Sequence, residues 1–592
     1  LGNMDELNIG KVTQVKGTTV KAKINHDLFQ STYFHNGKIL RGISINEFVL
    51  VRKGYQDIVG KIIGEEIVEN FNIRTDDIEQ KKYERFVELN ILGYFFEGKF
   101  YSGIKYLPMI NDRLYLISDD KISEIYSFSK NTKTPLINIG KSMLEELPIN
   151  IPINGVFNSH IGIFGNTGSG KSNTLAKIYQ SLFNRIENKQ QLIDKSNFVL
   201  IDFNGEYGTL ENSFPELCHS TKLSTKKDGD KIYFGEKEFW DDELLSVLFS
   251  ATEKTQKPFL THLIKSKLKY DDDLNTYLKR TIEIMFGTNP HKETVNLLKS
   301  LLPYFDENDQ QKIRDELSLF TWHSNQEKYT HPSGWLDTTA EVLKHTQATY
   351  NSQFHVTSVF DEIAIRATLQ LINSVSRNYV QYDHIYPLIN KIIAMSSSLA
   401  KVIEINRAQQ SYKPISIISL KECNQTIKKT IPMMIAKCSF IEHKSSDNKK
   451  ESFHLIIDEA HNILSESSVR EAETWKDYRL ELFEEIIKEG RKFGYFVTIS
   501  SQRPFDISPT IVSQLHNYFI HRLVNENDLY LLKNTLSTLD AASRTLIPTL
   551  PPGACIISGT AFHTPLLVQI DRLSEESAPQ SDTLDLESLW RL

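Results

Sequence analysis

The feature that most constrains this chain is a glycine-rich loop at residues 165–172, which reads GNTGSGKS. It matches the phosphate-loop pattern, in which two glycines enclose four residues and a lysine and a serine follow. A short apolar run at 161–164 precedes the loop, and an amphipathic run at 172–178 follows it. Because strand, glycine loop and helix are the setting that this motif requires, the sequence predicts a nucleotide-binding α/β domain.

The residue types in the loop predict how a nucleotide would be held. Glycines let backbone N–H groups curl around phosphate oxygens, and the N-terminus of the following helix adds partial positive charge. Lys171 can reach the β- and γ-phosphates, and the Ser172 hydroxyl can ligate Mg²⁺. The predicted ATP-binding residues of the loop are Gly165, Asn166, Thr167, Gly168, Ser169, Gly170, Lys171, Ser172 and Asn173.

Bulk properties indicate a multidomain globular protein. The 592 residues suffice for about three or four domains, and 40% hydrophobic and 24% charged residues are typical of that class. No apolar run approaches the length of a membrane span, and no secretory segment opens the chain. The four cysteines lack metal or redox spacing, which fits a reducing compartment. We therefore expect a cytoplasmic protein without a membrane partner.

The net charge of −7 excludes a general basic coat. Any contact with nucleic acid must therefore come from a local basic surface, such as a pore or groove.

Composition changes along the chain predict five segments. Many short apolar runs with glycine turns indicate a small β-barrel over residues 1–145, including a strand pair joined at Glu97-Gly98. Residues 147–155 read as an extended linker. Helical periodicity dominates 236–410 and predicts an insertion that divides the ATP-binding core into 146–235 and 411–573. Residues 574–592 form a tail.

Two acidic residues follow a buried strand soon after the loop helix. Residues 197–202 are an apolar run that ends in Asp202, and Glu206 lies four residues further on. Ligands bind at strand tips of parallel sheets, so both are candidate nucleotide-site residues. The local sequence alone also fits a simple turn.

A second chemical centre is the segment FHLIIDEAH at residues 453–461. In a phosphate-loop ATPase the first carboxylate, Asp458, would hold the Mg²⁺ shell, and the second, Glu459, would polarise the attacking water. Taken alone, the segment could be an ordinary strand end. His461 has no His or Cys partner at metal-ligand spacing, so we expect it on the surface or behind the residues that touch the nucleotide.

Two further candidates flank the strand at residues 495–501. Gln502, at its tip, could sense the γ-phosphate or place water. Arg491 comes just after a helix and could reach the nucleotide of a neighbouring subunit. The alternative is that Arg491 and Lys492 only cap the helix C-terminus, which the helix dipole favours.

These segments in this order resemble the HerA family, hexameric ATPases of the FtsK/HerA group of DNA-pumping motors. The likeness rests on GNTGSGKSNT, IDFNGEYG, LIIDEAHN, IIKEGRKFGYFVTISSQRP and LPPGACIISGTAFHTPLLVQIDR. It implies a small barrel ahead of a RecA-like ATPase core. It also implies Lys171 and Ser172 on phosphate and Mg²⁺, Asp458 on Mg²⁺, Glu459 as base, Gln502 as sensor and Arg491 as a finger in a neighbour. The insertion looks larger than is usual for the family.

The resemblance implies a Mg²⁺-dependent ATPase that forms a ring of six subunits and moves double-stranded DNA. Its bacterial members work with a nuclease or a Sir2-like effector, often in anti-phage defence, and archaeal members work in DNA end processing. A second hypothesis is an ATP-locked scaffold that activates an effector with little DNA pumping. A third, a conjugative coupling ATPase, is disfavoured because the sequence shows no membrane segment.

The tail combines a polar stretch with an apolar end. Residues 574–581 are polar and include Pro579, which predicts a flexible tether. Leucines and Trp590 among residues 584–592 predict an apolar grip on an adjacent subunit; the alternative is a frayed terminus.

Overall fold

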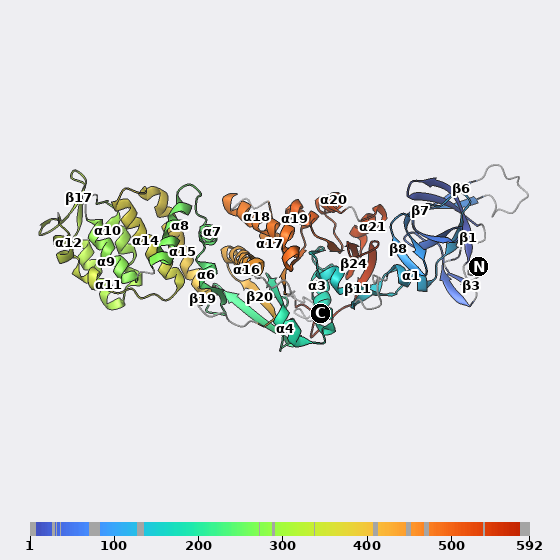
Figure 1. Cartoon of the computed structure of the whole chain (residues 1–592), viewed down its shortest axis with the longest axis horizontal. Helices are drawn as coiled ribbons and strands as arrows, with labels where there is room; N and C mark the ends of the chain where they lie inside the picture. Colours follow the sequence, from blue (N-terminus) through green and yellow to red (C-terminus); the bar gives the residue numbers. More distant parts are fainter. Residues whose placement is uncertain are drawn as a thin grey trace, which may run out of the picture.

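The computed structural model is elongated, with a barrel at one end, an α/β core in the middle and a helical insertion at the other end (Figure 1). The structure describes the following residues: 7–25, 30, 32–35, 37–69, 83–126, 135–270, 273–286, 290–336, 338–406, 413–445, 451–466, 473–536 and 539–580. No helix in these ranges is both long and apolar enough to cross a membrane.

The N-terminal region is a closed six-stranded barrel, as the sequence predicted. Strands β2 and β7 pair and close a sheet that otherwise runs β2-β1-β9-β5-β6-β7, with β8 added outside β7. Alternate residues point inward, so that Val20, Ala22 and Ile24 of β2 are buried. The strands are β1 (Asn8–Lys16), β2 (Thr19–Ile24), β5 (Phe48–Lys53), β6 (Gln56–Glu69), β7 (Tyr83–Phe96), β8 (Lys99–Ser102) and β9 (Arg113–Leu116).

The predicted turn at Glu97-Gly98 is confirmed. Both residues have positive φ, 50° and 78°, the conformation of a tight hairpin turn, and they join β7 to β8. A separate hairpin and a short helix complete the region: β3 (Thr32–His35), β4 (Lys38–Arg41) and α1 (Asp119–Ile125).

An eleven-stranded sheet forms the core. Its order is β11-β10-β25-β24-β23-β12-β22-β21-β13-β20-β14, and the seven strands from β23 to β14 are parallel. The strands are β10 (Leu136–Ser142), β11 (Pro148–Pro152), β12 (Ile161–Phe164), β13 (Ser196–Asp202), β14 (Cys218–Ser224), β20 (Ile415–Glu422), β21 (Ser452–Ile457), β22 (Tyr495–Ser501), β23 (Asn517–Ile520), β24 (Ala554–Gly559) and β25 (Leu566–Ile570).

The sheet corrects two sequence interpretations. Strand β10 belongs to the core although it lies before residue 146, where the core was expected to begin. Strand β11 pairs with β10, so residues 147–155 are not simply a linker; they continue into a short helix, α2 (Ile153–Phe157). Both strands are antiparallel additions, and β10 joins them to β25, which comes more than 400 residues later, a pairing that local sequence does not reveal.

Helices cover both faces of the parallel strands because those strands are buried on both sides. The carboxyl ends of β12, β13, β21 and β22 meet at one edge, where the candidate residues follow them. The helices are α3 (Lys171–Arg185), α4 (Lys189–Lys195), α5 (Thr209–Ser213), α16 (Gln425–Ser445), α17 (His461–Leu464), α18 (Glu473–Glu489), α19 (Pro509–Ser513), α20 (Glu526–Thr535) and α21 (Ala541–Leu546), with 3-10 turns η3 (Gly490–Phe493), η4 (Pro504–Asp506) and η5 (Ile547–Thr549).

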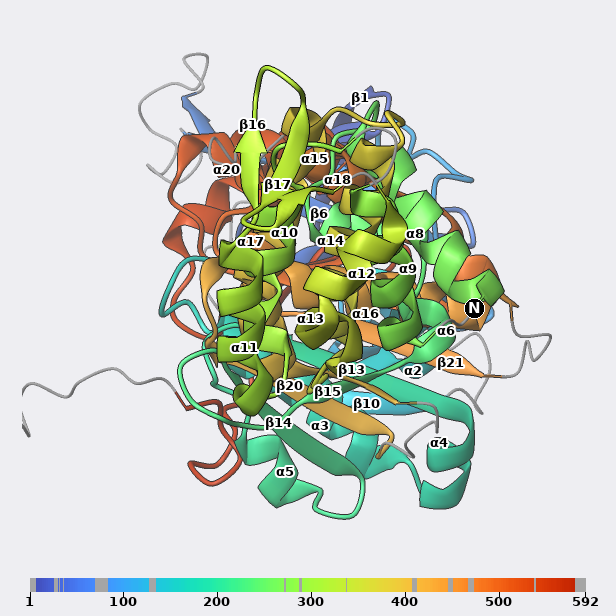
Figure 2. The same ribbon diagram turned by 90° about the vertical axis from the view of Figure 1, so that its left-hand side faces the viewer.

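The insertion leaves and re-enters the core through a parallel strand pair, β15 (Ile232–Gly235) and β19 (Ile403–Asn406). Figure 2 views it end-on. Its helices are α6 (Glu236–Phe239), α7 (Asp242–Leu248), α8 (Gln256–Tyr270), α9 (Leu274–Met285), α10 (Thr294–Ser300), α11 (Glu307–Ser318), α12 (Thr339–His345), α13 (Gln347–Asn351), α14 (Val359–Ser376) and α15 (Tyr382–Val402), with the 3-10 turn η2 (Leu302–Tyr304). The insertion is mainly helical, but a small sheet that the sequence did not predict interrupts it: β16 (Thr321–His323), β17 (Lys328–His331) and β18 (Gly334–Trp335).

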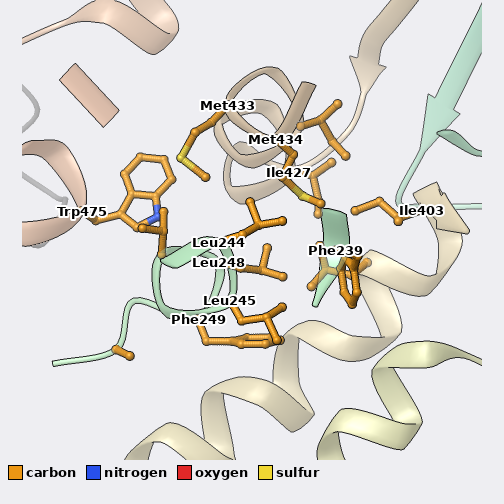
Figure 3. Close-up of a cluster of buried hydrophobic side chains, with 14 of the residues drawn as sticks. Phe239, Leu244, Leu245, Leu248, Phe249, Ile403, Ile427, Met433, Met434 and Trp475 are labelled. Atoms are coloured by element: carbon orange, nitrogen blue, oxygen red, sulfur yellow. The ribbon is translucent and has the colours of Figure 1, made fainter. Parts of the chain in front are cut away.

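An apolar cluster attaches the insertion to the core (Figure 3). Leu244 and Leu248 of α7 pack between Met434 of α16 and Trp475 of α18. The buried Lys437 of α16 adds an ion pair to Asp241, 2.7 Å away, at the start of α7. Burial of this apolar surface holds the root of the insertion against the core helices.

The first part of the tail is bound to its own core. The Gln180 side chain donates to Ser577 O, the Thr209 hydroxyl donates to Ala578 O, and Gln580 N donates to Glu206 O. This differs from the flexible tether predicted for 574–581. Residues 581–592, predicted to grip an adjacent subunit, lie outside the described residues.

Candidate nucleotide site

The phosphate loop joins β12 to α3, as the motif predicted. Gly170 has φ +103°, and a Cβ on it would lie 2.8 Å from the Gly553 Cα. Gly553 N in turn donates to Ser169 O at 2.9 Å. Only glycine at 170 therefore allows both the left-handed backbone and the close approach of the 549–553 segment.

Lys171 lies at the centre of a buried charge cluster. Its Nζ is 3.0 Å from Asp458 Oδ1, 3.0 Å from Glu459 Oε1 and 3.1 Å from Ser500 Oγ. Burial alone would lower the pKa of Lys171, but the Asp458 and Glu459 carboxylates outweigh it and raise that pKa. Lys171 is therefore a fixed cation that joins the phosphate loop to the ends of β21 and β22.

The residues beside Lys171 fit a magnesium ion. Asp458 is fully buried, and its Oδ2 has no hydrogen-bond partner. Glu206 lies near Ser172 and Asp458; burial, followed by the charge of Asp458, raises the pKa of the Glu206 carboxyl. No group of three or more His, Cys, Asp or Glu side chains in the described ranges could hold a metal by itself. Asp458 and Ser172 could serve Mg²⁺, which binds through one or two carboxylates together with nucleotide phosphates and water.

Glu459 is held in a strained backbone conformation with φ +49°. Its Oε2 lies 3.2 Å from His461 Nδ1, so His461 stands directly behind the candidate base. Burial opposes ionisation of Glu459, but His461 and Lys171 outweigh it and lower the pKa to about 2. Glu459 is therefore an ionised carboxylate between two nitrogen partners.

Gln502 is brought to the phosphate loop. Strand β22 lies between β12 and β21, so its tip stands beside both the loop and the acidic pair. The Gln502 side-chain oxygen accepts a hydrogen bond from the Thr167 hydroxyl. This is the position that a γ-phosphate sensor needs.

The side chains of Asp202 and Asn173 form hydrogen bonds with backbone groups of the protein itself. The Asp202 carboxylate, 1% exposed, accepts from the backbone N–H groups of Asn204, Gly205 and Tyr207. It therefore shapes the loop that carries Glu206, which is the turn role left open by the sequence. The Asn173 side chain donates to Asp571 O and accepts from Leu573 N, so it anchors the segment after β25.

Arg491 is not brought to the site of its own chain. It lies in η3, just before β22 begins, and its Nη1 is 3.4 Å from His516 Nε2. Strands β12 and β22 are parallel, with Phe164 beside Ser501, so the phosphate loop follows the opposite end of β22. Seven residues of strand separate the two ends by about 20 Å.

Sequence reasoning missed three contributors. Ser500 contacts Lys171, and Gly553 packs on the phosphate loop. Tyr207 is fully buried, and burial, followed by the nearby Asp458, raises the pKa of its hydroxyl. Its place five residues after the strand-ending Asp202 was the available signal; the other two depend on contacts between distant segments.

The chain is similar to several known proteins. The model of the family "Helicase HerA, central domain" matches residues 137–437. The DNA double-strand break repair helicase HerA of Pyrococcus furiosus is 23% identical over 567 residues, covering 90% of this chain and 88% of that protein. The protein of the same name from Sulfolobus acidocaldarius is 22% identical, covering 88% and 84%. The VirB4 structure of Thermoanaerobacter pseudethanolicus has a TM-score of 0.41 at 12% identity, covering 75% of this chain and 98% of that one.

The fold and the Lys171–Asp458–Glu459 cluster define a phosphate-loop ATPase, an enzyme that hydrolyses ATP. More narrowly, the chain belongs to the HerA helicase family of DNA-translocating ATPases, since that family's model covers half of its length.

Proposed function

We propose that this protein is a Mg²⁺-dependent motor that assembles as a six-membered ring and moves double-stranded DNA through its centre. The observation that carries the proposal is the position of Arg491, at the edge of the sheet opposite to its own phosphate loop. An arginine placed there can serve only the ATP of a neighbouring subunit. In a closed ring every nucleotide site has an adjacent subunit, and each RecA-like core contributes its Arg491 to one neighbouring site.

Each residue has a role in hydrolysis. Lys171 binds the β- and γ-phosphates, and Ser172 and Asp458 would hold Mg²⁺, which neutralises phosphate charge and lowers the cost of transfer. Glu459 takes a proton from the attacking water, and Gln502 orients the γ-phosphate. Arg491 of a neighbour stabilises charge that develops in the transition state. The phosphoryl group passes directly to water without a covalent intermediate.

ATP and the acidic pair compete for Lys171. Its ammonium contacts both carboxylates at 3.0 Å, so phosphate binding must draw it away from at least one of them. That exchange removes a positive charge from Glu459 and makes it a stronger base. ATP binding thereby contributes to the activation of the base.

We propose further that a nuclease or Sir2-like effector binds the ring, with anti-phage defence or DNA end processing as the setting, in the cytoplasm. The barrel supports a docking role. More than half of the exposed large apolar side chains in the described residues lie between positions 34 and 110. They include Phe34 at 81% and Tyr55 at 98% exposed. We infer a partner contact in this region from this concentration of exposed apolar side chains.

The same surface favours the second candidate, an ATP-locked scaffold that activates an effector without pumping DNA. The two functions differ in what DNA does to turnover. Duplex DNA should stimulate ATP hydrolysis, and the ring should displace a third strand from a DNA triplex in an ATP-dependent manner, while Lys171→Ala does neither. If the ring forms with ATP but ignores duplex DNA, while Glu459→Gln still activates the partner, the scaffold is correct.

A further inference from the structure

One imidazole nitrogen, His461 Nδ1, lies between two partners. It forms a hydrogen bond with Ser501 Oγ at 3.3 Å and lies 3.2 Å from Glu459 Oε2, an oxygen that has no partner in hydrogen-bond geometry in this structure. The His461 and Glu459 side chains are only 16% and 11% exposed, so water competes weakly for these contacts. His461 belongs to α17, whereas Ser501 is the last residue of β22.

The two contacts compete for one atom, Nδ1, which carries at most one proton. An ionised carboxylate only accepts hydrogen bonds, so Nδ1 must carry the proton to bind Glu459. The Ser501 hydroxyl oxygen already accepts from Arg503 N at 3.0 Å and keeps its own proton to donate. Nδ1 can accept a hydrogen bond from that hydroxyl only when it has a free lone pair, that is, in the tautomer with the proton on Nε2. In the tautomer without a proton on Nδ1, His461 can bind Ser501 but not the Glu459 carboxylate.

Ser501 is connected to the phosphate loop. It precedes Gln502, whose side chain accepts from Thr167 of the loop. The backbone also links the two strand ends, because Ala460 N donates to Ser500 O at 2.8 Å. A γ-phosphate that displaces Gln502 would thus move Ser501, the alternative partner of His461.

We propose that His461 is a positioning residue that couples the tip of β22 to Glu459. When Nδ1 donates to Glu459, the carboxylate is turned back towards α17. When Nδ1 accepts from Ser501, Glu459 is released towards the attacking water. This inference rests on the proposed function, in which Glu459 is the base.

Three substitutions isolate the Nδ1 atom. The amide of Asn lies where Nδ1 lies and can donate or accept, whereas the amide of Gln lies nearer to Nε2. His461→Phe keeps a ring but has neither group. Asn462→Ala changes the exposed neighbour on the same helical turn and is the matched control. ATP dissociation constants and single-turnover hydrolysis rates are measured for each, with thermal melting to establish folding.

We expect His461→Phe and His461→Gln to lower the hydrolysis rate by about 10- to 100-fold, the scale lost when a partner behind a site residue is removed. Their ATP dissociation constants should stay within about threefold of wild type, since His461 touches no phosphate-binding group. His461→Asn should recover most of the rate, and Asn462→Ala should equal wild type.

The variant Glu459→Gln, run in parallel, separates two failures. If Glu459→Gln is inactive and His461→Phe turns over at the wild-type rate, the role of His461 is wrong and the proposed function stands. Equal rate losses in the Asn, Gln and Phe variants would also overturn it, because a structural role does not depend on Nδ1. If Glu459→Gln hydrolyses ATP normally, Glu459 is not the base and both proposals fall.

Discussion

Lys171 Nζ and Glu459 Oε1 form a buried ion pair, 3.0 Å apart with side chains 5% and 11% exposed. The pair joins two segments that lie 288 residues apart in sequence. In the proposed mechanism, the cation that binds phosphate is therefore in contact with the carboxylate that accepts a proton. Nucleotide binding and base activation therefore involve the same lysine.

Glu459→Gln tests the base. The amide keeps the size of the side chain but loses its charge. Lys171 then has one ion pair fewer to break when it binds the phosphates of ATP. We expect ATP affinity equal to or tighter than wild type, and hydrolysis slower by at least about 10²-fold. Fluorescent-nucleotide binding and single-turnover assays measure the two quantities. The exposed Glu481→Gln is the matched control, and wild-type turnover in Glu459→Gln would remove Glu459 from catalysis.

DNA binding should depend strongly on salt. The chain carries a net charge of −7, so contact with duplex must rely on local Lys and Arg groups that bind phosphates. We expect affinity to fall on the order of 10²-fold between about 50 and about 200 mM salt, with little difference between unrelated sequences. Fluorescence anisotropy with two duplexes measures both. A salt-independent or sequence-selective affinity would contradict phosphate-dominated binding.

Stability should fall in mild acid because of buried neutral histidines. Burial lowers the pKa of His454 from 6.5 to about 3, and its ring stacks on Phe198 at 4.3 Å. A depressed pKa in the folded state means that stability is complete above the unfolded pKa and is lost as pH falls towards the folded one. For His454 the loss between about pH 7 and about pH 5 is about 2 kcal/mol.

His454→Phe should remove that part of the acid sensitivity while keeping the stack on Phe198. Urea unfolding of wild type and variant at both pH values gives the comparison. An identical loss of stability in the two proteins would show that His454 does not titrate on unfolding in this range.

Two truncations separate the halves of the tail. Ending the chain at Gln580 removes only residues 581–592, and we expect weaker ring assembly at low protein concentration. Ending it at Leu573 also removes the segment bonded to Gln180, Thr209 and Glu206, and we expect weaker ATP binding as well. Mass photometry and nucleotide titration follow the two effects. Unchanged assembly in the shorter truncation would exclude the predicted grip on a neighbour.

The parts of the fold that sequence predicted are those carried by local patterns. Strand, glycine loop and helix around Lys171 are contiguous, and so are β21 with its acidic pair and the turn at Glu97-Gly98. The positions of Gln502 and Arg491 at opposite ends of β22 also followed from local order.

What the sequence did not reveal depends on contacts between distant segments. Strand β10 joins the core sheet by pairing with β25, and Gly553 supports the phosphate loop from nearly 400 residues away. His461 was expected on the surface or behind the site, and only the three-dimensional arrangement shows its contact with Glu459 and Ser501. Asp202 lies at the predicted strand tip, but its carboxylate is occupied by its own loop.

We propose that Arg491 completes the nucleotide site of a neighbouring subunit. Arg491→Ala should keep ATP binding on Lys171 and lose about 10³-fold in turnover, the scale seen when such a finger is removed. Lys171→Ala should lose productive binding in its own subunit yet still offer an intact Arg491. Lys492→Ala, which changes the adjacent cation, is the control.

The most direct test mixes the two inactive variants, after labelled subunits have been shown to exchange, and measures ATP turnover. If Arg491 acts in a neighbouring subunit, we expect partial recovery of activity, because some interfaces then join an intact Lys171 to an intact Arg491 of the neighbour. A mixture of exchanged subunits that stays as inactive as its parents, or full activity of Arg491→Ala alone, would contradict it; in the second case Arg503 becomes the next candidate.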